Sequence, residues 1–282
     1  MTGLEKIKPS PASINRELTS ERSSPFEKFF SNPVYLLYKN HLYNYLARRF
    51  SVRKSLETHS PGKNAWILEL GSGVSPLLNA GSRTIRSDIS WQALVWLKTQ
   101  ESQQGPSPSV ASNATALPFA NESIQTVICS EVLEHIQDDE AVLREIGRVL
   151  CPGGELLLTC PMRPELFGFD DSFVGHFRRY EKDKLIGRLR QKGLAGFHIE
   201  PVLGSLEKIL MVALTRFLSF FPAGKGENPG NSSPGAVRVI ILALLPFYLF
   251  INYLLAFVVY QQARFGSLEK AVCLLIRCQK SL

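Results

Sequence analysis

The chain has 282 residues, of which 45% are hydrophobic, so one large domain or two small ones can bury a core. Basic residues outnumber acidic ones and give a formal net charge of +7 at pH 7. This excess suits an anionic partner such as a membrane surface, a nucleic acid or a phosphorylated substrate, or it serves solubility alone. The five cysteines show no CxxC spacing, so we predict no metal site and no disulfide-stapled secreted fold.

The N-terminal part divides into two segments. Residues 1–25 are polar and predict a flexible arm. Residues 26–60 contain aromatic and leucine side chains at helical spacing, which predicts a helical cap that ends at Ser60-Pro61-Gly62. A core domain is expected from residue 61 to residue 204.

Strand-like and helix-like patterns alternate in this core. Apolar runs predict strands at residues 65–70, 123–130, 155–160 and 197–203, and residues 83–88 can form another strand although they are polar for one. Amphipathic patterns predict helices at residues 91–98, 138–150 and 181–191. This order favours an α/β fold in which helices cover both faces of a parallel, doubly wound sheet. Ligands of such sheets bind at the carboxyl ends of the strands.

A hydrophobic insertion follows the core at residues 205–266. Within it, residues 239–263 carry no charge. As a helix they would be about 37 Å long, enough for a hydrocarbon core of about 30 Å. Pro246 and Asn252 argue against one straight span and favour a bend near the proline. Residues 267–282 contain another apolar run, which predicts a last strand at 270–280.

A glycine loop and an acidic residue mark a ligand site. Gly71-Ser72-Gly73 follows the first predicted strand, where glycine lets the backbone approach a ligand closely. Asp88 ends the second predicted strand, where a carboxylate can accept hydrogen bonds from ribose hydroxyls. Together they indicate a ligand that contains adenosine.

Five ordered blocks then resemble a known family. They comprise residues 67–73, 87–88, 113–119, 130–136 and 148–155. In them the chain is similar to class I S-adenosylmethionine-dependent methyltransferases of type 11, which modify small molecules and lipids. The resemblance spans about residues 62–200. It implies a Rossmann-like, mostly parallel seven-stranded sheet with an antiparallel last strand, and S-adenosylmethionine as the cofactor.

The resemblance also implies roles for individual residues. Those expected at the cofactor are Glu69, Gly71, Ser72, Gly73, Asp88, Ile89, Asn113, Ala114 and Ser130. Family members usually carry aspartate where this chain has Asn113, although an amide oxygen can accept from the adenine amino group.

Candidate catalytic residues follow the fourth and fifth predicted strands. Glu131 and His135 are candidates for a base, and the alternative for His135 is a helix-capping or packing role. His176 and Tyr180 are further candidates. Arg178 and Arg179 lie between them and could bind a phosphate or carboxylate of the substrate, or could begin a basic helix.

The insertion bears on location and substrate. The last strand must return to the same sheet, so one simple membrane crossing is excluded, and the insertion is expected to lie in the interface, re-enter, or cross twice. We expect a methyltransferase at the cytoplasmic face of a membrane that acts on a lipid, an isoprenoid or a lipid-linked glycan. The alternatives are a soluble small-molecule methyltransferase whose insertion is a lid, a non-catalytic adaptor, and a nucleotide-dependent oxidoreductase. The basic residues are dispersed, so no nucleic-acid partner is expected.

Overall fold

The computed structural model describes residues 40–58, 62, 65–79, 83–100, 107–219 and 235–282. The predicted arm at residues 1–25 and the first part of the predicted cap, residues 26–39, lie outside the described residues. The described end of the cap forms one helix, α4 (Tyr43–Thr58).

Within the described residues, seven strands form one sheet with the order β3-β2-β1-β4-β5-β7-β6. The strand bounds are β1 Ile67–Leu70, β2 Thr84–Asp88, β3 Ser109–Ala111, β4 Ile124–Ser130, β5 Leu150–Pro161, β6 Leu194–Leu203 and β7 Cys273–Lys280. β7 runs antiparallel to both of its neighbours, β5 and β6, whereas the pairs from β3 through β5 are parallel. The predicted Rossmann-like sheet with an antiparallel last strand is therefore confirmed.

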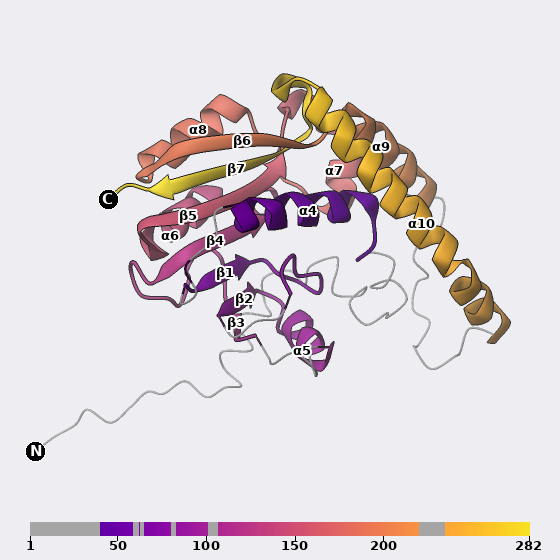
Figure 1. Ribbon diagram of the computed structural model, residues 1–282, viewed down its shortest axis with the longest axis horizontal. Helices are drawn as coiled ribbons and strands as arrows, with labels where there is room; N and C mark the ends of the chain where they lie inside the picture. Colours follow the sequence, from indigo (N-terminus) through magenta and orange to yellow (C-terminus); the bar gives the residue numbers. More distant parts are fainter. Residues whose placement is uncertain (1–39, 59–61, 63–64, 80–82, 101–106, 220–234) are drawn as a thin grey trace, which may run out of the picture.

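Helices cover both faces of the sheet (Figure 1). On one face, α6 (Asp139–Val149) and α8 (Lys182–Gln191) pack over a large core cluster. On the other face, α4 and α10 (Gly235–Phe265) cover a second cluster. α5 (Trp91–Gln100) lies beside β2 and β3. The remaining elements are α7 (Phe169–Val174), α9 (Ser205–Ser219) and the short 3-10 helices η1 (Leu133–His135), η2 (Pro164–Leu166) and η3 (Leu268–Lys270).

The period of two in a strand explains these two clusters. In β5, Leu156 and Leu158 belong to the cluster under α6 and α8, whereas Leu157 belongs to the cluster under α4 and α10. A strand that is buried on both faces needs an uninterrupted apolar run, and residues 156–158 supply one. α6 begins after Asp138, whose side chain caps the helix by accepting a hydrogen bond from the Ala141 amide at 2.9 Å.

The structure corrects two local expectations. β3 has three residues and was not predicted as a strand. β5 begins at Leu150 and runs through Pro152-Gly153-Gly154, where a break was expected, and its register with β4 shifts between Ile124 and Thr126. α10 continues through Pro246 as one helix, and the bend expected near this proline stays a prediction.

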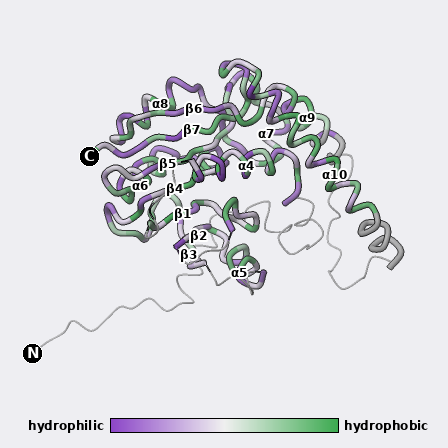
Figure 2. The backbone as a smooth tube through the Cα atoms, in the orientation of Figure 1, coloured by the Kyte–Doolittle hydropathy of each residue, from purple (hydrophilic) through white to green (hydrophobic). Residues whose placement is uncertain are grey.

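The insertion is a pair of helices between two neighbouring strands. α9 follows β6, and α10 leads back through η3 to β7. Figure 1 shows α9 and α10 side by side at one end of the sheet, and Figure 2 shows many hydrophobic residues along α10. The inner side of α10 carries Asn252, Ala256, Val259, Tyr260 and Ala263, all buried in the domain.

Candidate active site

The glycine loop is held against the end of β2. Gly71 has a φ of +68°, and a Cβ atom at this position would overlap the side chain of Val132. Its amide donates to the Ser87 carbonyl oxygen at 2.7 Å, and the Gly73 amide donates to Oδ2 of Asp88 at 2.6 Å. Only glycine satisfies both the left-handed backbone and the close approach at position 71. The loop and the acidic residue that the sequence singled out therefore lie together at the carboxyl edge of the sheet.

The other residues expected at the cofactor differ in exposure and in hydrogen bonding. Ile89 follows Asp88 and is half exposed, whereas Ala114 is nearly buried. Asn113 uses its Oδ1 to accept a hydrogen bond from the Thr115 amide at 3.0 Å. The Ser72 side chain is buried, and its Oγ has no hydrogen-bond partner among the described residues.

Glu69 supports the chain that follows the glycine loop. Its side chain is buried and accepts a hydrogen bond from the Leu77 amide. Burial raises the pKa of Glu69 to about 7, although that hydrogen bond and nearby Arg86 act in the opposite direction. Glu69 thus fixes the return of the chain after the glycine loop.

Arg148 fastens the segment that follows β3. Its guanidinium group donates to the carbonyl oxygens of Leu117 and Phe119, at 2.9 and 2.7 Å. Glu145 pairs with Arg148 and also accepts from the Leu117 amide. The hydrogen bonds of Arg148 and Glu145 therefore join two of the sequence blocks, 113–119 and 148–155, and help to position Asn113 and Ala114.

Glu131 stands at the end of β4 in a strained conformation. Its φ is +54°, which is uncommon for a residue with a side chain and is typical of functional sites. One carboxylate oxygen lies 3.6 Å from a guanidinium nitrogen of Arg48, which α4 supplies. The other accepts from Thr159 at 3.3 Å and from the Cys273 thiol at 3.5 Å. Thr159 also shares a hydrogen bond with Ser130 at 2.7 Å.

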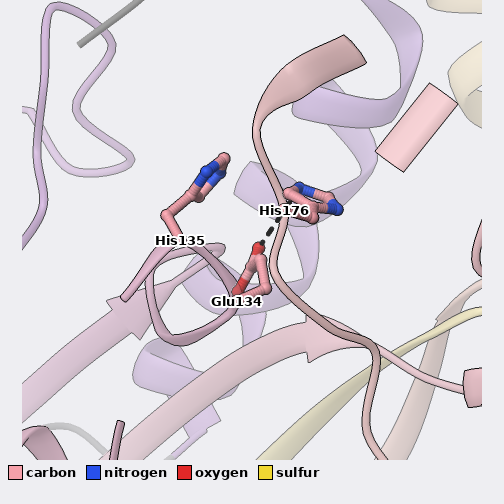
Figure 3. Close-up of side chains that lie close together, drawn as sticks. All are labelled: Glu134, His135 and His176. Atoms are coloured by element: carbon pink, nitrogen blue, oxygen red, sulfur yellow. Dashed lines mark ion pairs between the residues drawn. The ribbon is translucent and has the colours of Figure 1, made fainter. Parts of the chain in front are cut away.

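His135 and His176, both predicted as candidates, meet beside Glu134 (Figure 3). The two imidazole rings lie edge to face, with 4.7 Å between their centroids. Nδ1 of His135 lies 3.3 Å from the Gly175 carbonyl oxygen, and Nδ1 of His176 lies 3.0 Å from Oδ1 of Asp171. Burial, and then the nearby charge of Glu131, raise the pKa of Glu134 well above its ordinary value.

The basic residues after His176 are bound to carboxylates. Arg179 is buried and pairs with Asp171 at 2.7 Å. Arg178 lies 3.1 Å from Asp139. The predicted catalytic Tyr180 is buried and donates its hydroxyl to the same Asp139 at 2.8 Å, away from the glycine loop. In this arrangement Arg178, Arg179 and Tyr180 hold the segment after β5 in place, and their predicted roles toward substrate stay predictions.

Sequence reasoning missed four charged residues of this edge. Arg48 comes from α4 and Glu207 from α9, so neither belongs to a motif. Burial raises the pKa of Glu207 to about 7, against the opposing charge of Arg48. Asp171 binds His176, Arg179 and Lys208, and these contacts lower its pKa although burial alone would raise it. Glu134 belonged to a block that carried the resemblance, but its burial could not be seen in the sequence.

Comparison with known proteins places this part of the chain in a methyltransferase family. Residues 68–158 match the family model described as a methyltransferase domain. A demethylmenaquinone methyltransferase of Streptomyces griseus is 35% identical over 117 residues, which are 40% of this chain and 50% of that protein. Another, from Renibacterium salmoninarum, is 33% identical over 121 residues, or 42% of this chain and 50% of that protein. The chain thus spans about half the length of these curated relatives.

Solved structures share the fold at low sequence identity. An S-adenosylmethionine-dependent methyltransferase of Thermotoga maritima superposes with a TM-score of 0.54 at 15% identity, covering 91% of this chain and 98% of that one. Phosphoethanolamine N-methyltransferase 2 of Haemonchus contortus, solved with S-adenosyl-L-methionine, gives 0.52 at 14% identity, covering 83% of this chain and 52% of that one.

The strand order, the glycine loop and the family match identify the class. Residues 68–158 belong to a class I S-adenosylmethionine-dependent methyltransferase domain. The family, the enzyme class and the cofactor expected from the sequence are those of this domain. The resemblance stated from the sequence blocks is therefore confirmed. The glycine loop fits that cofactor, because Gly71 and Gly73 expose backbone without side chains where the loop meets the Asp88 carboxylate.

Proposed function

We propose that the protein transfers a methyl group from S-adenosylmethionine to a lipid-like small molecule at a membrane surface. The observation that carries the proposal is the junction of the Gly71–Gly73 loop with Asp88 at the carboxyl edge of the sheet. When bound, S-adenosylmethionine supplies an electrophilic methyl group. The backbone of the loop would hold its methionine part, and Asp88 would accept from its ribose.

The protein's remaining contribution is alignment and exclusion of water. Ile89 would pack on the adenine, and Asn113 and Ala114 would contact its edge. Glu131 and His135 lie on the substrate side, after β4. Either side chain can hold a substrate hydroxyl or amine and accept its proton. The cap helix α4 places Arg48 over Glu131 and shields this edge from solvent.

Two observations favour a lipid-like substrate: a lipid, an isoprenoid or a lipid-linked glycan. The relatives named above are demethylmenaquinone methyltransferases. In addition, four aromatic side chains near His176 are exposed: Phe167, Phe169, Phe173 and Phe177. Exposed aromatic groups gathered in one short segment are typical of a surface that receives an apolar molecule.

The outer side of α10 favours a membrane surface. By length and composition, residues 244–265 are the one stretch of the described chain that could cross a membrane, with a mean hydropathy of 1.6 and 22% of it buried. The inner side packs on the domain, so the helix is suited to lie in the interface. The exposed side chains are Leu244, Phe247, Phe250, Tyr253, Leu254, Phe257, Val258 and Phe265.

A groove between α4 and α10 adds basic groups to this apolar surface. It encloses about 360 Å³ and is lined by Phe50, Tyr253 and Phe257 together with Arg49 and Arg53. Guanidinium groups beside aromatic rings can bind anionic headgroups while the rings enter the acyl region. The cytoplasmic leaflet carries such headgroups, which supports the proposed location.

Calorimetry of the full chain tests the proposed activity. We expect wild-type protein to bind S-adenosylmethionine and not nicotinamide nucleotides, and Asp88→Ala to weaken binding at least about tenfold through lost ribose contacts. Asp183→Ala is the matched control, because the Asp183 side chain is 90% exposed on α8. Absence of S-adenosylmethionine binding would favour a non-catalytic adaptor, and binding of a nicotinamide nucleotide would favour an oxidoreductase. Mass spectrometry of lipid and glycan extracts from a deletion strain then identifies the acceptor.

A further inference from the structure

Three potential metal ligands converge just beyond β4. Glu134, His135 and His176 each place one ligand atom within 4.8 Å of those of the other two (Figure 3). The first two come from η1, and the third comes from the segment after α7. Two imidazoles and one carboxylate are a donor set that Zn²⁺ and other divalent transition-metal ions prefer.

Glu134 provides a second, independent observation. Its side chain is fully buried, and neither carboxylate oxygen has a hydrogen-bond partner among the described residues. Nε2 of His176 lies 3.9 Å from Oε1 of Glu134, which is beyond hydrogen-bond distance. A buried carboxylate without hydrogen bonds costs free energy unless a cation compensates it.

His176 is oriented as a metal-binding histidine usually is. Its Nδ1 is 3.0 Å from Oδ1 of Asp171, so Nε2 is directed toward Glu134. Asp171 is itself fixed by Arg179 at 2.7 Å and by Lys208 at 3.0 Å. A carboxylate behind an imidazole sets its tautomer and its direction in most metal sites. His135 has a comparable contact, between Nδ1 and the Gly175 carbonyl oxygen.

We propose that Glu134, His135 and His176 form a binding site for one divalent transition-metal ion. Ligand atoms at about 2.0–2.2 Å from a tetrahedral ion lie roughly 3.3–3.6 Å apart, so atoms that now lie within 4.8 Å of one another need to approach by at most about 1.5 Å. The side chain of Glu134 turns toward this point from the chain segment that also carries Glu131. No motif with metal-ligand spacing revealed the site, because His176 is 41 residues away in the chain from His135.

The position of the site suggests that the ion binds the substrate. This inference rests on the proposed function. Three protein ligands leave at least one coordination position open. The open position lies at the carboxyl edge of the sheet, where a substrate oxygen can bind. The ion would therefore select a substrate that presents a hydroxyl or another oxygen donor beside the methyl group.

Metal binding to the full chain tests this site directly. We expect Zn²⁺ or Mn²⁺, titrated alone into chelator-treated protein, to bind with one ion per chain. Glu134→Gln and His176→Gln should weaken that binding at least about tenfold, since even second-shell changes cost this much. His198→Gln is the matched control, because His198 pairs with Glu200 at 2.9 Å on the exposed surface of β6.

A spectroscopic measurement on wild-type protein covers the case in which a variant fails to fold. Co²⁺ bound by two imidazoles and a carboxylate should show the intense visible absorption of four- or five-coordinate cobalt, and Zn²⁺ should displace it. No stoichiometric binding, or equal binding by wild type and both site variants, overturns the proposal. Calorimetry with S-adenosylmethionine on the same samples keeps the two proposals apart, since His176→Gln should leave cofactor binding unchanged.

Discussion

Single residues at the carboxyl edge combine backbone and side-chain constraints that can be separated experimentally. Gly71→Ala adds a methyl group that overlaps Val132 at a φ of +68°. We expect it to lose about 1–3 kcal/mol of unfolding free energy and at least about tenfold in S-adenosylmethionine affinity. Denaturant unfolding and calorimetry measure the two effects.

The matched control for that change is Gly193→Ala. Gly193 has a φ of +77°, and a Cβ atom there meets nothing within 4 Å. It carries the backbone strain without the overlap, and it lies after α8, away from the loop. Equal cofactor affinities for Gly71→Ala and wild type would contradict the assignment of this loop to the cofactor.

At the same scale, the sequence predicts which residues follow each strand but not what they contact. Asp88, Glu131 and His135 lie at the expected edge because Asp88 ends β2, whereas Glu131 and His135 follow β4. The partners of these residues come from distant segments, as Arg48 does from α4 and Asp171 from α7. Such pairings depend on tertiary packing. Contacts between distant segments leave no local pattern in a single sequence, so they could not be predicted from it.

At the scale of elements, the outer side of α10 separates membrane attachment from a soluble lid. Phe250 and Phe257 are 64% and 60% exposed. We expect the double change Phe250→Asp and Phe257→Asp to abolish flotation of the full chain with anionic vesicles, because two charges would enter the acyl boundary. Val95→Asp on α5 is the control, at 43% exposure. Wild-type protein that stays soluble without detergent and fails to float would favour the lid.

Elements were predictable where a strong period or a cap exists. α6 has a capping aspartate and an amphipathic pattern, and it begins one residue from the predicted position. β3 has only Ser109, Val110 and Ala111, too few residues to show a period. In α10 the sequence predicts a bend from one proline in a long apolar run, and the structure shows that the helix assignment continues through it.

At the scale of the whole molecule, the insertion connects two neighbouring strands of the sheet. β6 and β7 are neighbours, and the Val272 amide donates to the Leu203 carbonyl oxygen at 2.8 Å. The chain therefore leaves and re-enters the domain at almost one point. α9 and α10 can cover a sheet face and reach a membrane without changing the strand order, as the return of the last strand requires.

Two buried carboxyl groups predict how the stability of the whole molecule depends on pH. Burial raises the pKa values of Glu69 and Glu207 from 4.5 to about 7. Because each folded-state pKa lies above the unfolded value, each group stabilises the fold fully below pH 4.5 and loses this contribution as the pH rises to about 7. The loss is about 3 kcal/mol per group at most, at roughly 1.4 kcal/mol per pKa unit.

Glutamine variants separate the pH dependence that is due to Glu69 and Glu207 from that of the carboxylates whose pKa values are lowered. Glu69→Gln and Glu207→Gln do not ionise, so the unfolding free energy of wild type minus that of each variant should fall between pH 4.5 and 7. A difference that rises with pH for Glu69→Gln would mean that the carboxylate is stabilised by the Leu77 amide and Arg86 more than burial penalises it, and that Glu69 supports the chain after the glycine loop as an ionised group.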